Sequence, residues 1–381
     1  MLEARPHEPA SLSDASSVNR DDVESRLDPI TGNWTIFAPH RGQRPEEFVP
    51  PKDFVGKQIR CPFCPGNESE TPPPVWVGRV VEDDSSHDVL DPSSFQSAKN
   101  DWSVRVVPNK FPAVGDASPR SHHAPKPPRE ASLFTRRPLT GGHEVIIESR
   151  SHATSLSQLD VAEIQLAFLA FRDRIRYWRG VPGIAYVTAF KNAGARAGAS
   201  LRHTHSQLIA TDRVPSAVAS MIDRMIRHRV SSGCCLLCDL VRAELKARQR
   251  VVWRDKSLIA YCPFASHLPM LVRVTTLEHQ ACYEDLDDLM IESAARLVRR
   301  VVAWLEKIRP GTAYNFCLHT RPPGTQDPPD SFHWSIDIFP RITQIAGFEW
   351  GSHCMINPVL PEIAASKFRA CAREEDPRRL R

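Results

Sequence analysis

The feature that most constrains the fold of this chain is one order of cysteines and histidines that occurs twice. Each copy has a Cys-x-x-Cys pair, then a single histidine, and then a His-x-His or His-x-Ser segment. The first copy comprises Cys61, Cys64, His152, His203 and His205, and the second comprises Cys235, Cys238, His279, His333 and Ser335. His152 precedes His203 by 51 positions and His279 precedes His333 by 54, so order and spacing together indicate a duplicated unit.

Both copies match the ligand preference of zinc. Zinc takes four ligands in a tetrahedron, drawn from thiolate and imidazole, and Cys-x-x-Cys places two sulfurs on one tight turn. We therefore expect one or two Zn²⁺ ions per chain. The predicted ligands are Cys61, Cys64, His152 and His203 in site 1, and Cys235, Cys238, His279 and His333 in site 2. The alternative is a redox Cys-x-x-Cys pair, or a chance pairing with unrelated histidines.

The pattern of apolar residues predicts the same elements in both halves of the chain. Strands are expected over residues 102–107, 144–148 and 184–190, and again over 257–261, 270–274, 314–318 and 334–339. Long helices are expected over residues 159–179 and 285–307, where apolar residues recur at helical spacing. The predicted fold class is α+β, with duplicated units whose antiparallel sheets are each backed by a long helix. We expect a disordered tail (1–25), a catalytic half (26–225), a non-catalytic half (226–365) and a basic tail (366–381).

The His203-Thr-His205-Ser-Gln207 segment predicts covalent chemistry on a histidine. Positions 203, 205 and 207 of a strand point to the same face, so a metal-bound His203 would fix His205 and Gln207 beside it. His205 could then attack phosphorus as a nucleophile, and the Gln207 amide could donate to a phosphoryl oxygen. The alternative is that both histidines are ordinary metal ligands, which would leave Gln207 unexplained.

The glycines upstream of this segment suggest a phosphate-binding turn. Gly194 and Gly198 allow the backbone to approach a phosphate closely, and the Ser200 hydroxyl could donate a hydrogen bond. The corresponding face of the second copy carries Ser335 in place of the nucleophile, and Asp337, which would repel phosphate. We therefore expect one catalytic and one structural half.

Composition excludes several classes of partner. The 381 residues carry a formal net charge of only +4, which gives no reason to expect nucleic acid. The chain has no unbroken apolar stretch of about 18 residues, so no membrane span is expected. Residues 1–28 are polar and lack the apolar core of a signal peptide, so we expect a cytoplasmic protein.

The chain resembles the galactose-1-phosphate uridylyltransferase family, a branch of the histidine-triad superfamily, from about residue 26 to residue 362. Beyond the His-x-His segment, the matching stretches are Arg26-Leu-Asp-Pro-Ile-Thr-Gly-Asn-Trp34, Ala38-Pro-His-Arg41-Gly-Gln-Arg44-Pro45, Asn109-Lys-Phe-Pro112, Phe190-Lys-Asn192-Ala-Gly194 and Gly347-Phe348-Glu349. The resemblance implies a ping-pong transfer of a nucleoside monophosphate. It implies that His205 is the nucleophile and that Gln207 and Ser200 contact the transferred phosphoryl group.

The resemblance also implies roles for residues farther from the nucleophile. Asn192, Arg41 and Arg44 would hold phosphates or ribose, and Asn109 would lie near the base. Family members are commonly homodimers, so a homodimer is expected here. Phe348 and Glu349 would then be contributed to the site by the partner chain.

Three positions depart from the galactose branch of the family. Thr204 stands where that branch has a proline, and Thr343 and Met355 replace a lysine and a glutamine that grip the sugar phosphate. The segment from Gly194 to Gln207 is instead similar to the ADP-glucose phosphorylase branch, in which inorganic phosphate accepts the nucleotide.

The resulting hypothesis is a zinc-containing nucleotidyltransferase. It would act on a nucleoside-diphosphate sugar and pass the nucleotidyl group to inorganic phosphate or a sugar 1-phosphate. Two alternatives stay open from the sequence: a nucleotide-sugar hydrolase with water as acceptor, and a non-enzymatic binding protein stabilised by zinc.

Overall fold

The computed structural model describes residues 23–43, 60–81, 87–93, 102–116, 133–325 and 328–376. Most of the strands in these ranges form one 12-stranded sheet, in the order β10-β11-β12-β14-β13-β8-β9-β7-β5-β3-β4, with β6 paired to β7. The strands are β3 Trp76–Val80, β4 His87–Leu90, β5 Val104–Pro108, β6 Gly115–Asp116, β7 Thr140–Ile147, β8 Tyr186–Ala193, β9 His205–Thr211, β10 Val251–Arg254, β11 Leu258–Tyr261, β12 Val272–Thr276, β13 Tyr314–His319 and β14 Ser335–Pro340. All pairs are antiparallel except β6 with β7.

The sheet contains the predicted repeat. In the first half β5 and β7 precede helix α1 (Val161–Gly180), and β8 and β9 follow it. In the second half β11 and β12 precede α4 (Asp288–Ile308), and β13 and β14 follow it. The two sets join where β8 pairs with β13, so the halves form one continuous sheet rather than the two separate sheets that were expected.

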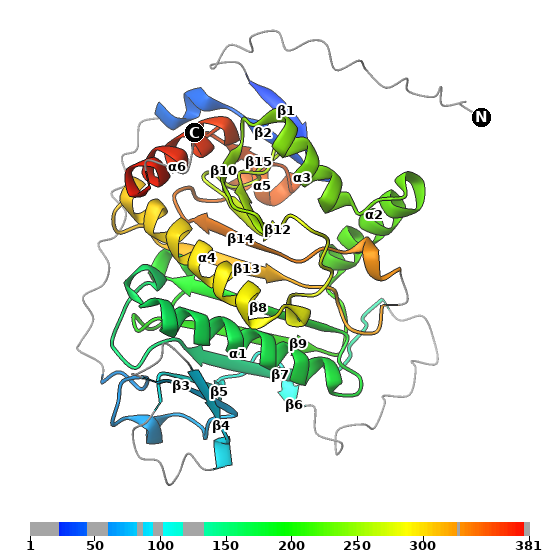
Figure 1. Ribbon diagram of the computed structural model, residues 1–381. Coiled ribbons are helices and arrows are strands. Elements are labelled where there is room, and N and C mark those ends of the chain that lie inside the picture. The colour runs from blue at the N-terminus through cyan, green and yellow to red at the C-terminus, as the bar shows by residue number, and fades with distance from the viewer. Residues whose placement is uncertain are drawn as a thin grey trace.

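Helices α1 and α4 lie side by side across the same face of this sheet (Figure 1). Helix α1 begins at a capping box made by Asp160 and Glu163. Its apolar side, including Phe168 and Phe171, is fully buried in the main core. Both long helices were predicted from their periodicity, and both are confirmed to within three residues at each end. This face of the sheet is therefore filled by the core.

The remaining elements cover the second half and its edge. They are α2 Ser216–Ser232, α3 Leu236–Ala247, α5 Gly347–Ser352, α6 Pro361–Glu375, and a small sheet of β1 Glu24–Leu27, β2 Trp34–Phe37 and β15 Met355–Asn357. No helix in the described ranges is both long and apolar enough to cross a bilayer.

Two expected tail boundaries need correction. The ordered chain was expected from residue 26, but β1 already begins at Glu24; residues 1–22 lie outside the described ranges. The expected basic tail at 366–381 is wrong for residues 366–375, which belong to α6. Phe368 and Ala372 bury an apolar side of α6 against α4 and β10, and this contact holds the segment on the fold.

Candidate active site and metal clusters

Strand β9 presents His205 and Gln207 on the face of the sheet opposite α1. Leu208 and Ala210 of β9 are fully buried in the core beneath α1. Because side chains alternate along a strand, His205 and Gln207 point to the other face. The register places Ile147 of β7 opposite His205 and Phe190 of β8 opposite Gln207. The two residues are thus held between two strands.

The structure brings the four predicted site 1 residues together just before β9. The ligand atoms of Cys61, Cys64, His152 and His203 all lie within 4.8 Å of one another. The Nδ1 atom of His203 is 3.6 Å from Cys61 Sγ and 3.5 Å from Cys64 Sγ. The Nδ1 atom of His152 is 3.1 Å from Cys64 Sγ. Two thiols and two imidazole nitrogens in this arrangement could hold a metal ion.

A hydrogen bond from Nε2 orients the His203 ring so that Nδ1 can bind a metal. Its Nε2–H donates to the carbonyl oxygen of Ser149 at 2.9 Å, which leaves the Nδ1 lone pair facing the two sulfurs. Burial lowers the pKa of His203 to about 4, so the ring is neutral at neutral pH. A neutral imidazole with its lone pair directed at two thiols fits a transition metal.

The second cluster repeats this arrangement. The ligand atoms of Cys235, Cys238, His279 and His333 also lie within 4.8 Å of one another. Both histidine Nδ1 atoms are 3.4 Å from Cys238 Sγ. The Nε2 atom of His333 lies 2.8 Å from the hydroxyl of Thr276, as His203 Nε2 lies near Ser149. The two halves thus contain matching clusters, each able to hold a metal ion.

His205 is buried and held in one tautomer. Its Nδ1 lies 2.7 Å from the carbonyl oxygen of His203, and a carbonyl can only accept, so Nδ1 carries the proton. The Nε2 lone pair is left free, and no described residue bonds to it. Burial lowers the pKa of His205 and keeps the ring neutral. Phe63, between the two cysteines of site 1, packs edge-on against the ring at 5.2 Å. A neutral imidazole with a free Nε2 is a competent nucleophile.

A buried ion pair supports β9 from the opposite face. Lys191 of β8 and Glu148 are both buried, with Nζ 2.5 Å from a carboxylate oxygen. The Lys191 Nζ also donates to the Thr204 hydroxyl at 2.8 Å and to the His205 carbonyl oxygen at 3.0 Å. Glu148 accepts from the Ser206 hydroxyl as well. This network fixes the backbone around His205. Sequence reasoning missed it because a lysine and a glutamate 43 residues apart give no sign of contact.

Gln207 has a partner that the sequence analysis also missed. The side-chain oxygen of Gln207 lies 2.8 Å from Nε2 of His143, a residue of β7. The sequence of residues 140–147 is compatible with a strand. His143 could be placed next to Gln207 only once the register of this strand against β9 was known.

The turn before β9 has the backbone that its glycines predict. Gly194 and Gly198 have φ values of 85° and 91°, which favour glycine, and they flank a single 3₁₀ turn at Ala195–Ala197. Asn315 of β13 ties this turn to the second half: its amide donates to the Ala197 carbonyl and, at 2.8 Å, to the Asn192 side-chain oxygen. The Asn192 NH₂ group is therefore the part of that side chain directed away from Asn315.

The other predicted contact residues are placed unevenly around His205. Asn109 lies beside His143, at 3.1 Å. Ser200 is exposed on the turn, and Arg41 lies in an exposed 3₁₀ turn at Pro39–Gln43. Arg44 lies outside the described residues. Phe348 and Glu349 are on α5, which lies with the second half and away from β9 in this chain (Figure 1).

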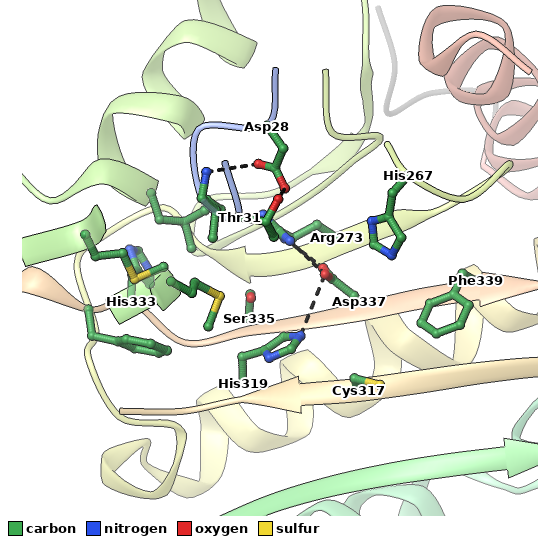
Figure 2. A pocket seen from close by; sticks show the side chains of 15 residues that line it. Asp28, Thr31, His267, Arg273, Cys317, His319, His333, Ser335, Asp337 and Phe339 are labelled. Atoms are coloured by element: carbon green, nitrogen blue, oxygen red, sulfur yellow. Dashed lines mark hydrogen bonds and ion pairs between the residues drawn. The ribbon is translucent and has the colours of Figure 1, made fainter. Parts of the chain in front are cut away.

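The second half has a pocket at the position that corresponds to His205 and Gln207 of the first half. A cavity of about 200 Å³ lies beside His333. Ser335, Asp337 and His319 line it, as Figure 2 shows. Arg273 binds the Asp337 carboxylate through two hydrogen bonds of 2.7 Å, which neutralises both charges. With a serine in place of His205 and a paired carboxylate in place of Gln207, this pocket lacks a nucleophile equivalent to His205.

Comparison with known proteins assigns the family. A family model described as a domain of unknown function (DUF4921) matches residues 115–371. The ADP-glucose phosphorylase of Arabidopsis thaliana is 31% identical over 93% of this chain and 95% of its own length. The galactose-1-phosphate uridylyltransferase of Thermotoga maritima is 23% identical over 91% of this chain and 98% of its own length.

The chain belongs to the galactose-1-phosphate uridylyltransferase family. Solved structures agree: an Arabidopsis thaliana ADP-glucose phosphorylase with bound ADP-glucose superposes with a TM-score of 0.73 at 30% identity, over 91% of this chain and 99% of that one. A uridylyltransferase structure at 23% identity has the same fold, with a TM-score of 0.67 over 92% of this chain and 98% of that one.

Membership in this family confirms three predictions. The chain is an enzyme, it is a nucleotidyltransferase, and it has the family's α+β fold. The hypothesis of a non-enzymatic binding protein is thereby set aside. The roles of individual residues, the identity of the metal and the choice of substrates are separate questions, which the geometry around His205 addresses.

Proposed function

We propose that this enzyme transfers the adenylyl group of an ADP-sugar, with ADP-glucose as the first candidate, to inorganic phosphate through a covalent intermediate on His205. The observation that carries this proposal is the fixed tautomer of His205, which leaves the Nε2 lone pair of a neutral ring free on the face of β9 opposite α1. The similarity to ADP-glucose phosphorylase supports the adenosine base and the phosphate acceptor. Thr343 and Met355 support them too, because they replace the sugar-phosphate contacts of the galactose branch.

The reaction has two displacements at the same phosphorus. In the first, Nε2 of His205 attacks the α-phosphorus, the bond from that phosphorus to the bridging oxygen breaks, and sugar 1-phosphate leaves. In the second, an oxygen of inorganic phosphate attacks the same phosphorus, the bond to Nε2 breaks, and ADP is released. The Nδ1–H bond to the His203 carbonyl stabilises the positive charge that the ring gains on phosphorylation.

The groups around the phosphorus have complementary roles. Gln207 donates to a phosphoryl oxygen from the amide nitrogen that His143 leaves free. Ser200 and the backbone at Gly194 and Gly198 approach the phosphates from the turn. Asn192, Arg41 and Arg44 bind phosphate or ribose, and Asn109 lies toward the base.

Zn²⁺ is the proposed metal for both clusters, because two thiolates and two imidazoles are the ligand set of structural zinc. When bound, zinc would tie each Cys-x-x-Cys turn to its sheet. In the first half it would also hold His203, whose carbonyl oxygen orients the nucleophile. Residues 26–225 then form the catalytic half and residues 226–365 the non-catalytic half.

A homodimer is proposed to complete the site. Phe348 is half exposed on α5, although it is a large apolar side chain. Phe348 and Glu349 belong to a family-like segment, but α5 lies with the second half of its own chain (Figure 1). A partner chain could bring this segment to His205.

The test is to incubate the purified protein with ADP-glucose and UDP-glucose, each labelled at the α-phosphate. We expect acid-labile, base-stable label on the protein from ADP-glucose, and none in a His205→Asn variant that keeps its metal content and melting temperature. Release of ADP should then require inorganic phosphate. Label from UDP-glucose would change the base, and sugar 1-phosphate released at multiple turnover without any acceptor would favour a hydrolase. Full activity of His205→Asn would refute the mechanism.

A further inference from the structure

His143 lies next to the proposed phosphoryl site, and the mechanism above gives it no role of its own. It is half-buried on β7, on the face that carries His205 and Gln207. The register pairs Val145 with Gln207 and His143 with Ile209, so His143 is the diagonal neighbour of Gln207. A side chain at this position can control the orientation of Gln207.

The hydrogen bonds of the His143 ring fix its tautomer. The backbone N–H of Ala113 points at Nδ1 from 3.1 Å. A backbone N–H can only donate, so Nδ1 must be the acceptor and the proton of the neutral ring must be on Nε2. Burial lowers the pKa of His143 and so favours this neutral form.

This tautomer in turn fixes the amide of Gln207. Because Nε2–H of His143 is a donor, the Gln207 atom 2.8 Å away must be the carbonyl oxygen. The NH₂ group of Gln207 then points away from His143. The amide nitrogen of Asn109 also lies 3.1 Å from His143 Nε2, while its oxygen accepts from the N–H of Phe111 at 2.9 Å. In this tautomer the Asn109 amide nitrogen and His143 Nε2 are both donors, so they do not bond to each other. The acceptor of the His143 Nε2–H is therefore the Gln207 oxygen.

We propose that His143 is a positioning residue, which holds the Gln207 amide with its NH₂ group facing the phosphoryl group beside His205. This inference rests on the proposed function, because it gives Gln207 a phosphoryl oxygen to bind. Without His143 the amide could rotate and present its oxygen to a negatively charged group. His143 itself is not a proton carrier, since both of its nitrogens are engaged.

The kinetic test compares His143→Phe, which keeps a ring but removes both nitrogens, with His143→Gln, whose amide can still donate to Gln207. We expect His143→Phe to lower the rate constant of adduct formation about ten- to a hundredfold, with donor affinity changed less than about threefold, because the lost donor acts on charge that develops in the transition state. His143→Gln should recover most of the rate. His87→Phe, on edge strand β4 of the same sheet, is the matched control and should leave the rate unchanged.

A double-mutant cycle separates positioning of Gln207 from a general structural effect. In a Gln207→Ala background there is no amide to orient, so adding His143→Phe should lower the rate less than about threefold. An equal loss in both backgrounds would overturn the proposal, as would a loss confined to donor affinity.

Imidazole nitrogen NMR on protein labelled with ¹⁵N-histidine tests the geometry without any reaction. At pH 7.5 the His143 signals, assigned from their loss in His143→Phe, should show a protonated Nε2 and an unprotonated Nδ1. Replacing Gln207 by alanine should shift the Nε2 signal. A ring protonated on Nδ1 would overturn the proposal even in an active enzyme. If the wild type forms no adduct with any donor, the proposed function fails, and the NMR result alone decides the geometry.

Discussion

The rings of the two histidines in the His203-Thr-His205 segment are hydrogen-bonded through different nitrogens. His203 uses Nε2–H to bind Ser149 and turns Nδ1 toward the thiols of Cys61 and Cys64. His205 uses Nδ1–H to bind the His203 carbonyl and keeps Nε2 free. One backbone segment therefore carries one ring whose Nδ1 faces two thiols and another whose Nε2 is free, as the separate roles proposed for the two histidines require.

Replacing each histidine should consequently have a separate effect. We expect His203→Asn to lose about one zinc ion per chain and much of the stability of the first half, because a structural zinc site contributes on the order of 10 kcal/mol to folding. Metal analysis and thermal unfolding measure both. The matched control is His205→Asn, which should keep its zinc and its melting temperature. Equal zinc content in the wild type and in His203→Asn would remove His203 from the ligand set.

Strand β9 is the element on which the site depends, and it carries different chemistry on its two faces. His205 and Gln207 lie on the face opposite α1. Ser206, on the other, lies with Lys191 and Glu148, whose charges are buried. Burial lowers the pKa of Lys191, and the neighbouring carboxylate opposes that shift. Removing one partner of such a buried pair is strongly destabilising, because the remaining charge is left without a counter-charge and without contact with water.

Removing one partner of this pair should cost more than removing both. We expect Lys191→Met to lower the free energy of unfolding by about 3–5 kcal/mol, since it leaves the Glu148 carboxylate buried without its cation. Adding Glu148→Gln should restore part of that loss, because the amide oxygen can still accept from Ser206. Urea unfolding of the two single variants and the double variant gives the coupling energy. Additive losses would contradict a direct interaction between the two side chains.

At the scale of the molecule, the two halves share one sheet, and only the first half is proposed to be catalytic. The pairing of β8 with β13 places Asn315 of the second half against the turn that precedes β9. The second half thus supports the first half directly. In the pocket of the second half, Arg273 forms an ion pair with Asp337, as Figure 2 shows. The proposed dimer adds another level, because α5 of the second half would serve the partner's site.

Complementation between inactive chains tests this dimer. We expect His205→Asn and Glu349→Ala to be inactive separately, and a co-expressed mixture to recover about one quarter of wild-type activity, because half of a random mixture is heterodimer and each heterodimer has one intact site. Sedimentation should give twice the chain mass. No recovery in a mixture shown to contain heterodimers would mean that Glu349 acts in its own chain, or not in the site.

The sequence alone determined much of this protein. Periodicity placed α1 and α4, and the repeated order of cysteines and histidines paired each Cys-x-x-Cys with distant histidines that the fold brings within ligand distance. Helical periodicity is a local pattern and the cysteine–histidine order is a repeated one, so both can be recognised without knowledge of the tertiary structure. The expected tail at 366–381 was wrong in part, because a basic composition hid the apolar side of α6.

Only the tertiary structure determined the side-chain contacts that depend on the register between paired strands. His143 meets Gln207, Lys191 meets Glu148, and Asn315 meets Asn192 because strands far apart in sequence pair with one particular alignment. A slip of one residue would turn each of these side chains to the opposite face. Strand pairing also merged the two expected sheets into one. The residues proposed to perform the chemistry can therefore be identified from the sequence, whereas the partners that orient them are brought together only when the strands pair.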